Sequence, residues 1–274
     1  MSYDGRESSL ESGNPLNCYL FRRDALAYAY TNADRPQEIN NIQFESGVQI
    51  SDDGHQSSGE TQASTMTITL NASSAISRQY REYTPSSPVT LTVWSKHADD
   101  AEYVVSWAGL VMDATWIDQS TCRLNCMTIA AAMNSPGLIK CWQRNCSNVL
   151  YDSDCGVAQS SYRNEVTATS VDGLSVTALG IDPIITPDGY YTGGILEWMT
   201  VDGVTERRSI RSHTGNQLVL LGGTAGLPAG TLVAIYPGCN LTIQQCSAKF
   251  NNVDNYGGQP HQPGRSPFDG NQVF

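Results

Sequence analysis

Four of the eight cysteines in this 274-residue chain stand in two pairs that could bind one metal group. Cys146 and Cys155 have eight residues between them, and Cys239 and Cys246 have six. Zinc-binding knuckles have roughly two to four intervening residues, so the wider spacing is more compatible with an iron–sulfur cluster. Turns permitted by Gly156 and by Pro237-Gly238 would let backbone N–H groups reach sulfur. Spacing alone leaves three alternatives open: a cluster, a zinc ion and buried unligated thiols.

The other cysteines have simpler explanations. Cys122 and Cys126 alternate with Leu124 along an expected strand and should face the core. Cys18 is an extra cysteine outside the two pairs. Cys141, five residues before Cys146, could compete as a ligand, but a buried thiol is the preferred interpretation.

The four histidines, His55, His97, His213 and His261, stand in polar or turn-like contexts. We expect ordinary surface or hydrogen-bonding side chains. Only His213 is a candidate hydrogen-bond donor near Cys239. Asp152 and Asp154 are expected to shape the cysteine loop, because they lack the ligand spacing of an EF-hand.

The composition indicates a folded, mostly β protein. The chain is 40% apolar and carries a net charge of −11 with a pI near 4.7, and such an acidic chain repels a phosphate backbone. We therefore expect no nucleic-acid sequence recognition. The polar first residues predict no signal peptide, and no apolar run predicts a stable membrane span. Thiols or metal ligands are then expected in place of disulfides.

Alternating apolar residues predict strands on both sides of the cysteine segments. Residues 1–140 form a first β-rich domain that begins with a mobile arm, 1–14, and includes a short helix at 74–83. Its strands are expected at 15–21, 25–31, 65–70, 89–94, 102–109, 110–116 and 121–129.

A second β-rich module is expected between the cysteine pairs, over residues 157–236. Its strands are expected at 164–170, 174–180, 193–200, 207–212, 217–221 and 232–236, separated by Gly-containing turns. This pattern predicts a small β-barrel or sandwich inserted between cysteine segments 141–156 and 237–260. Residues 261–274 should form an extended C-terminal tail.

Several segments around the cysteines resemble a single protein family: Cys146–Cys155, Gly189–Trp198, Arg207–His213, Tyr236–Cys239 and Cys246–Pro260. The family is that of the tail-tip, or baseplate hub, proteins of long-tailed phages and gene transfer agents, to which minor tail protein L of lambda-like phages belongs. The likeness is strongest over residues 141–260. Weaker similarity extends to 15–21, 30–34 and 107–109.

The resemblance implies a structural protein of the virion tail tip, made and assembled in the host cytoplasm. It implies that residues 1–140 adapt the tail tube to the tip, between distal tail or tail tube proteins and the central tip protein, in a homotrimeric ring. It also implies a [4Fe-4S] cluster held by Cys146, Cys155, Cys239 and Cys246, with zinc as the alternative. The expected fold is mainly β: an N-terminal β-sandwich or barrel, a four-cysteine clasp, an inserted β-barrel and an extended tail.

Two other classes of function stay open beside this one, and an enzyme is not expected. No cysteine or other nucleophile has a recognisable base, and the Gly-rich stretch 222–226 lacks the Lys and Ser/Thr of a phosphate loop. One alternative is an iron–sulfur electron carrier. The other is a zinc-stabilised receptor-binding tail module, for which Tyr190, Tyr191 and Trp198 would have to form an exposed platform. Arg207, Arg208 and Arg211 could pair with acidic groups across an interface or form a solvated strand face.

Overall fold

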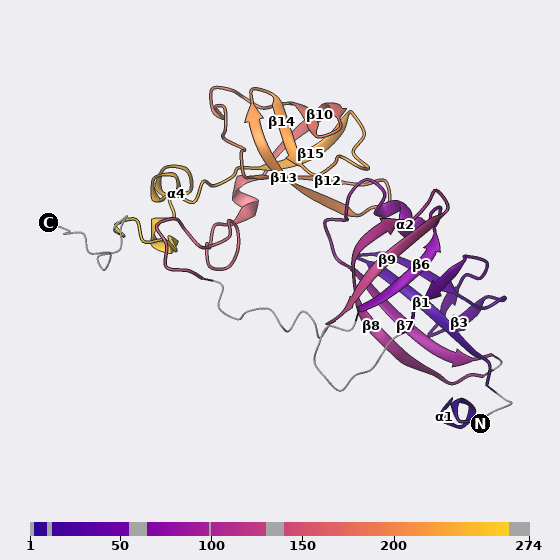
Figure 1. Cartoon of the computed structure of the whole chain (residues 1–274). Coiled ribbons are helices and arrows are strands. Elements are labelled where there is room, and N and C mark those ends of the chain that lie inside the picture. Colours follow the sequence, from indigo (N-terminus) through magenta and orange to yellow (C-terminus); the bar gives the residue numbers. More distant parts are fainter. Residues whose placement is uncertain (1–2, 10–12, 55–64, 99, 130–139, 263–274) are drawn as a thin grey trace. The chain divides into compact units, whose positions relative to one another are not determined.

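The computed structural model describes residues 3–9, 13–54, 65–98, 100–129 and 140–262. The chain divides into two compact units (Figure 1). The first unit comprises Met1–Ser135 with Val201–Glu206, and the second comprises Pro136–Thr200 with Arg207–Phe274. Each unit is described separately below.

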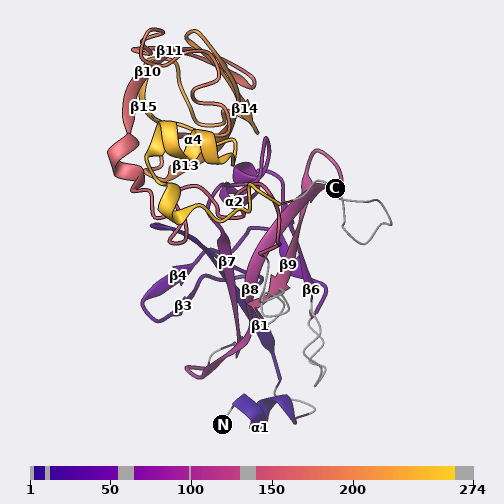
Figure 2. The same ribbon diagram turned by 90° about the vertical axis from the view of Figure 1, so that its left-hand side faces the viewer.

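A seven-stranded antiparallel sheet forms the body of the first unit, with strand order β2-β1-β7-β8-β9-β6-β5. Figure 2 shows β7, β8, β9 and β6 of this sheet side by side. The strands are β1 (Pro15–Arg23), β2 (Leu26–Thr31), β5 (Ile50–Asp52), β6 (Thr65–Asn71), β7 (Val89–His97), β8 (Tyr103–Trp116) and β9 (Thr121–Thr128). A separate hairpin pairs β3 (Gln37–Ile39) with β4 (Ile42–Phe44).

Alternation in the sequence decides which side chains enter the cores of this unit. On β9, Cys122, Leu124 and Cys126 share one buried face, as predicted. Strand β1 is buried on both faces: Tyr19 and Phe21 enter the larger core, while Cys18 and Leu20 pack with residues of the β3–β4 hairpin. Both sheet faces of β1 are therefore covered.

The predicted sandwich or barrel is confirmed only in part for this unit, because its main sheet is a half-barrel that does not close. Alternation defines the two faces of a strand, but it does not reveal whether the edge strands of a sheet meet.

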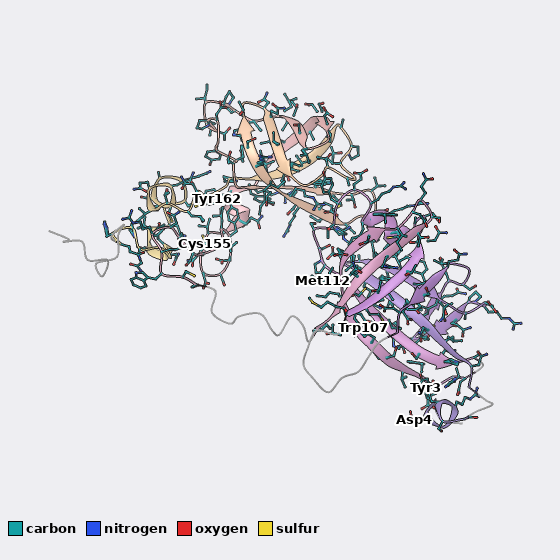
Figure 3. The ribbon with its side chains drawn as sticks, in the orientation of Figure 1. Tyr3, Asp4, Trp107, Met112, Cys155 and Tyr162 are labelled. Atoms are coloured by element: carbon teal, nitrogen blue, oxygen red, sulfur yellow. The ribbon has the colours of Figure 1, made fainter. Side chains whose placement is uncertain are left out.

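Strand β8 is one continuous strand of 14 residues where the sequence predicted two. The predicted boundary between Gly109 and Leu110 does not occur, because both residues pair with β7 and β9. Other groups also occupy the space beside the Gly109 Cα. A Cβ there would lie 2.2 Å from the Met127 carbonyl oxygen and 2.3 Å from the Trp107 ring. Glycine is needed here for close packing and not for a turn. Figure 3 marks Trp107 on this strand.

The predictions for residues 1–14 and 74–83 need correction. Residues 1–14 contain a helix, α1 (Tyr3–Glu7), where a mobile arm was predicted. Polar contacts hold it: the Tyr3 N–H donates to Glu102, and Arg6 pairs with Asp100 at 3.3 Å. The predicted helix at 74–83 is the shorter α2 (Ala75–Gln79), capped by Ser74.

A closed six-stranded barrel forms the centre of the second unit, as predicted for residues 157–236. Around the barrel the strands are β10 (Asn164–Asp172), β11 (Ser175–Leu179), β14 (Gln217–Leu221), β13 (Thr205–Thr214), β12 (Ile195–Met199) and β15 (Thr231–Tyr236). Its interior is apolar and includes Leu196, Trp198 and Ile235. The unit also contains α4 (Ile243–Phe250) and two short 3-10 helices, η1 (Gln159–Tyr162) and η2 (Val253–Asn255).

Candidate cysteine site

The structure brings the four predicted cysteines to one small cavity in the second unit. Cys146, Cys155, Cys239 and Cys246 all line it. Apolar groups, among them Leu150, Val157 and Phe250, form much of the remaining wall. A backbone hydrogen bond joins the two cysteine segments, since the Cys146 N–H donates to the Leu241 carbonyl at 2.9 Å.

The loop from Cys146 to Cys155 is shaped by Asp152, as predicted. Its carboxylate accepts hydrogen bonds from the N–H groups of Cys155 at 2.6 Å and Val149 at 3.1 Å. Gly156 follows with φ of 70°, a left-handed conformation that glycine adopts readily. Asp154 has a different role and pairs with exposed Lys140 at 2.9 Å. One carboxylate therefore fixes the turn that positions Cys155.

Helix α4 carries Cys246, although no helix was predicted over these residues. Thr242 caps the helix, with its hydroxyl accepting from the Gln245 N–H at 3.3 Å. Thr followed three residues later by Gln is the capping-box pattern, so the sequence contained a signal for this helix. Asn251 ends the helix in a left-handed conformation. Cys246 lies in the helix interior, and Cys239 lies in the turn before it.

Three of the four sulfurs accept hydrogen bonds from N–H groups. Cys239 Sγ accepts from the Leu241 amide at 3.3 Å, and Cys146 Sγ accepts from the Gly257 amide at 3.3 Å. Cys155 Sγ lies 3.8 Å from the Asn252 side-chain amide nitrogen. The Cys246 thiol instead donates to the Asn252 carbonyl at 3.1 Å. N–H donors directed at sulfur favour a thiolate over a thiol.

Asn148 and Asn252, which were not predicted as site residues, hold the cysteine segments together. Buried Asn148 donates to the carbonyls of Asp154 at 3.1 Å and Asn255 at 3.0 Å. The side-chain nitrogen of Asn252 that contacts Cys155 Sγ also donates a hydrogen bond to the Cys155 carbonyl at 2.6 Å. Asparagine is common in loops of any protein, so its type and position gave no signal of this role.

Lys249 is a second unforeseen residue, one turn after Cys246 on α4. Its ammonium donates to the carbonyls of Gly238, at 2.7 Å, and Tyr190, and it lies 4.1 Å from the centre of the Tyr190 ring. Burial lowers the pKa of Lys249 to about 8, although the nearby Cys239 opposes this change. The site thus contains a half-buried cation beside the cysteines.

The surroundings of Cys239 and Cys246 oppose ionisation of their thiols. Burial raises the pKa of Cys239, and the neighbouring Cys146 and Cys155 raise it further. Burial also raises the pKa of Cys246, again with smaller contributions from the other three cysteines. The cysteines are therefore close enough to influence one another's ionisation, and a bound cation would favour their thiolate forms.

The donor set suits a thiophilic group, but it is not arranged around a point. Within the described parts of the chain, no group of three or more His, Cys, Asp or Glu side chains is placed to hold a metal ion. The predicted iron–sulfur clasp is therefore not confirmed, and the ligand roles of the four cysteines stay predictions.

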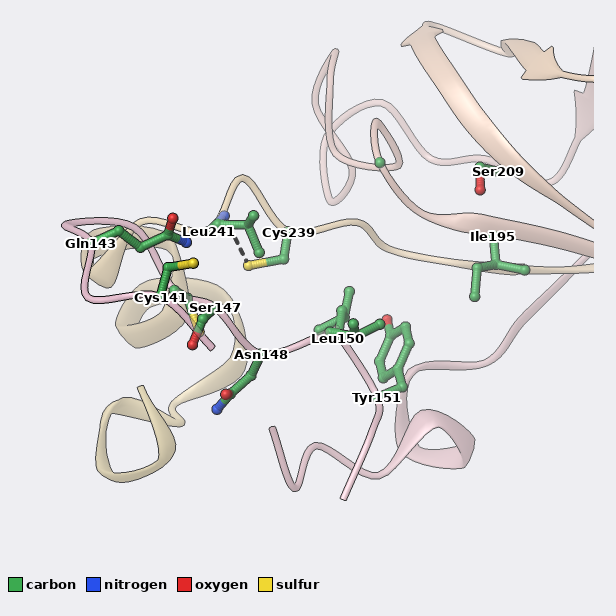
Figure 4. A pocket seen from close by; sticks show the side chains of 13 residues that line it. Cys141, Gln143, Ser147, Asn148, Leu150, Tyr151, Ile195, Ser209, Cys239 and Leu241 are labelled. Atoms are coloured by element: carbon green, nitrogen blue, oxygen red, sulfur yellow. Dashed lines mark hydrogen bonds between the residues drawn. The ribbon is translucent and has the colours of Figure 1, made fainter. Parts of the chain in front are cut away.

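Cys141 is exposed, so the prediction of a buried thiol is wrong for this residue. It precedes the loop that Asp152 organises, and the apolar side chains nearby do not cover it. Cys141 lines a separate, open cavity of about 500 Å³ together with Cys146, Cys239 and barrel residue Ile195. Figure 4 shows Cys141 and Cys239 on one side of this cavity and Ile195 on another.

Other predicted candidates lie away from the cysteines. His213 is buried in the barrel, where its Nε2 is 2.9 Å from the Gly215 carbonyl oxygen and its ring packs on Tyr191. Both of these contacts are with barrel residues, and they do not support a role for His213 as a hydrogen-bond donor to Cys239. Tyr191 and Trp198 are each only 2% exposed and belong to the barrel core. They cannot form the exposed platform that a receptor-binding module would need.

The remaining histidines and arginines are ordinary. His97 is buried against α1, where it contacts Glu7, and its Nδ1 accepts a hydrogen bond from the Asn14 N–H at 3.2 Å, so it is one of the hydrogen-bonding histidines expected. Arg207 pairs with Glu197 at 2.8 Å across neighbouring strands, and Arg208 lies over the Trp198 ring. His55 and residues 263–274 of the predicted tail lie outside the described residues. No helix in the described chain has the length and apolar character to span a membrane.

Comparison with known proteins gives matches over both units. Residues 12–158 match the family model described as baseplate hub protein, N-terminal attachment domain. Residues 189–266 match the model described as phage conserved hypothetical protein BR0599. A solved structure titled "Virion of native gene transfer agent (GTA) particle" contains a chain of similar fold, with a TM-score of 0.77 and 19% identity over 100% of this chain and 99% of that chain. No curated protein matches.

Proposed function

We propose a function from family membership, since the chain belongs to the family of baseplate hub proteins that share this N-terminal attachment domain. A baseplate hub protein is a structural protein of a virion tail. Within that class, we assign this chain to the tail tip, where it joins distal tail or tail tube proteins to the central tip protein. Three copies would form a ring, in which identical surfaces meet around the axis. The narrower likeness to minor tail protein L belongs to this same proposal.

The second part of the proposal is a structural [4Fe-4S] cluster bound by Cys146, Cys155, Cys239 and Cys246. The observation that supports it most is that all four side chains line one largely apolar cavity. N–H groups directed at three of the sulfurs add support, because such donors stabilise cluster thiolates.

The wide spacing of the four cysteines in the sequence favours a cluster over zinc. Zinc needs its sulfurs about 2.3 Å from a single point, and the described residues contain no group placed in that way. A cluster is larger than one ion and accepts ligands from more separated backbone positions. When bound, it would cross-link the two cysteine segments that flank the barrel and lower the entropy of the unfolded chain.

Metal content and spectroscopy test the cluster. Anaerobically purified protein should be brown, with visible sulfur-to-iron charge-transfer absorbance and about four irons per chain. Cys146→Ser and Cys246→Ser should lose iron. Cys141→Ser is the matched control, because Cys141 is exposed and lies outside the four-cysteine cavity. A colourless protein with stoichiometric zinc would contradict the cluster.

Particle assembly tests the structural role. Chains that lose iron should fail to enter tails, or should give tails that do not infect. Normal assembly of iron-free variants would show that the cluster is dispensable for structure. Folded, assembled particles with only a redox defect would favour the electron-carrier alternative.

A further inference from the structure

Lys96 in the first unit has a mostly buried side chain, and its ammonium has no counter-charge among the described residues. The residue is only 9% exposed. No ion pair or hydrogen bond joins its ammonium to any residue that the structure describes. Its Nζ is not among the enclosed side-chain nitrogens that lack a partner, so the ammonium faces solvent in a cleft, where an anion could reach it.

The strand register explains how Lys96 comes to be buried. Lys96 lies opposite Leu16 of β1 and two residues after Trp94 on β7, so it projects from the same face as Trp94. On that face Leu16, Cys18 and Trp94 form a small apolar core. Burial raises the pKa of the Cys18 thiol, although Lys96 opposes this rise. The thiol therefore stays neutral near pH 7 and gives Lys96 no counter-charge.

Lys96 lines a polar cleft of about 520 Å³ in the first unit. The loop after β2 supplies Asn32, Asp34 and Arg35 to the same cleft, and Gln37 at the start of β3 also lines it. The side-chain oxygen Oδ1 of Asn32 accepts a hydrogen bond from the Asn17 backbone N–H at 2.8 Å, and this orientation leaves the side-chain NH₂ group of Asn32 to donate to a ligand. The lining thus offers ammonium, guanidinium and amide donors.

The charge of the lining indicates which anion fits. Lys96 and Arg35 contribute two positive charges and Asp34 one negative charge, so the net formal charge is +1. A single carboxylate would neutralise this cleft. A phosphate dianion would exceed that charge and would also face Asp34.

We propose that this cleft binds one carboxylate, presented by an acidic side chain of a neighbouring protein chain in the assembled tail. The proposal rests on the proposed structural role in the virion and adds a specific contact to it. Lys96 supplies a positive charge at the end of a mostly buried side chain, and Arg35 and the amide groups supply hydrogen bonds.

Zero-length cross-linking tests the contact directly. A water-soluble carbodiimide couples an amine only to a carboxylate that touches it, and mass spectrometry identifies the linked peptides. In assembled particles, Lys96 should be linked to an Asp or Glu of a neighbouring chain, and the free chain should lack this link. If Lys96 is unlinked in particles that contain the chain, or is linked to its own Asp34 in both samples, the proposal is wrong. Absence of the chain from particles would instead contradict the proposed function.

A free small carboxylate is the competing source of the same chemistry. Succinate is the probe: it is added to the free chain and to disassembled particles before coupling. Coupling of succinate to Lys96, combined with no neighbour link in intact particles, would overturn the proposal in favour of a small-molecule site.

Substitution separates binding from folding. Lys96→Met keeps the length of the side chain and removes its charge, so the free chain should unfold at the same or a higher temperature. Its incorporation into particles should fall about tenfold or more. Arg123→Met removes one exposed cation from β9 and is the charge-matched control, which should be incorporated normally. Equal incorporation of both variants, or a parallel loss of thermal stability in Lys96→Met, would show that Lys96 has no partner to bind.

Discussion

Replacement of Asn148 by alanine should loosen the cysteine segments without unfolding the barrel. Its side-chain amide joins the Cys146–Cys155 loop to the segment after α4 through the carbonyls of Asp154, at 3.1 Å, and Asn255, at 3.0 Å. Both hydrogen bonds disappear in Asn148→Ala. Because they connect residues up to 107 positions apart, the loss should affect both segments.

The size of the effect follows from these two hydrogen bonds. At about 0.5–1.5 kcal/mol for each bond, their loss costs roughly 1–3 kcal/mol. The Asn148 side-chain oxygen is buried and has no partner among the described groups, so its removal offsets part of this cost. A net loss of about 1–2 kcal/mol corresponds to a roughly 5- to 30-fold increase in local opening.

Hydrogen–deuterium exchange measured by mass spectrometry can detect this increase. Peptides from residues 146–156 and 250–257 should exchange faster in Asn148→Ala, while barrel peptides from residues 164–180 should be unchanged. Asn145→Ala is the control, because Asn145 lies three residues earlier in the same segment and is exposed. Equal exchange in the two variants would refute the assigned role of Asn148.

Three further changes test other parts of the structure. Gly238→Ala would place a Cβ 1.9 Å from the Thr192 carbonyl oxygen, so calorimetry should show the second unit destabilised by at least about 1–3 kcal/mol. Tyr151→Phe removes the hydrogen bond from its hydroxyl to the Pro237 carbonyl at 2.7 Å, and iron bound to the anaerobic protein should be lost faster to a chelator than from the parent chain. Burial raises the pKa of Cys126 to about 12, so above about pH 9 only the unfolded thiol loses its proton. The folded state then binds more protons than the unfolded state, and stability should fall with rising pH by up to about 1.4 kcal/mol per unit; urea titrations should show a shallower fall in Cys126→Ala.

Periodicity predicted the strands well because it reports burial directly. The alternation of Cys122, Leu124 and Cys126 with polar residues gave the buried face of β9, and the turn residues gave the six strands of the barrel. It could not show whether a sheet closes, because closure depends on pairing between strands far apart in sequence. It also misjudged Gly109, since a glycine required for packing looks the same in sequence as a glycine required for a turn.

The cysteine site was only partly predictable for a related reason. Cysteine spacing and the family resemblance indicated which four residues to examine, and the structure brings those four to one cavity. The groups that hold them there act through backbone carbonyls, as Asn148, Asn252 and Lys249 do. Every residue has such a carbonyl, so these partners leave no pattern in the sequence.

The connection between the barrel and the cysteines is short and closely packed. Tyr236 ends the last barrel strand, paired with Ile195, and Cys239 follows three residues later. The backbone packed around Gly238, between them, leaves no room for a side chain. The Gly238 carbonyl also accepts a hydrogen bond from the Lys249 ammonium of α4. A group bound by the cysteines would therefore act on the end of β15 through a backbone that has little freedom to adjust. If the proposed cluster is bound, the cysteine site would be a fixed anchor for the barrel, and the four cysteines would have a structural role that needs no substrate.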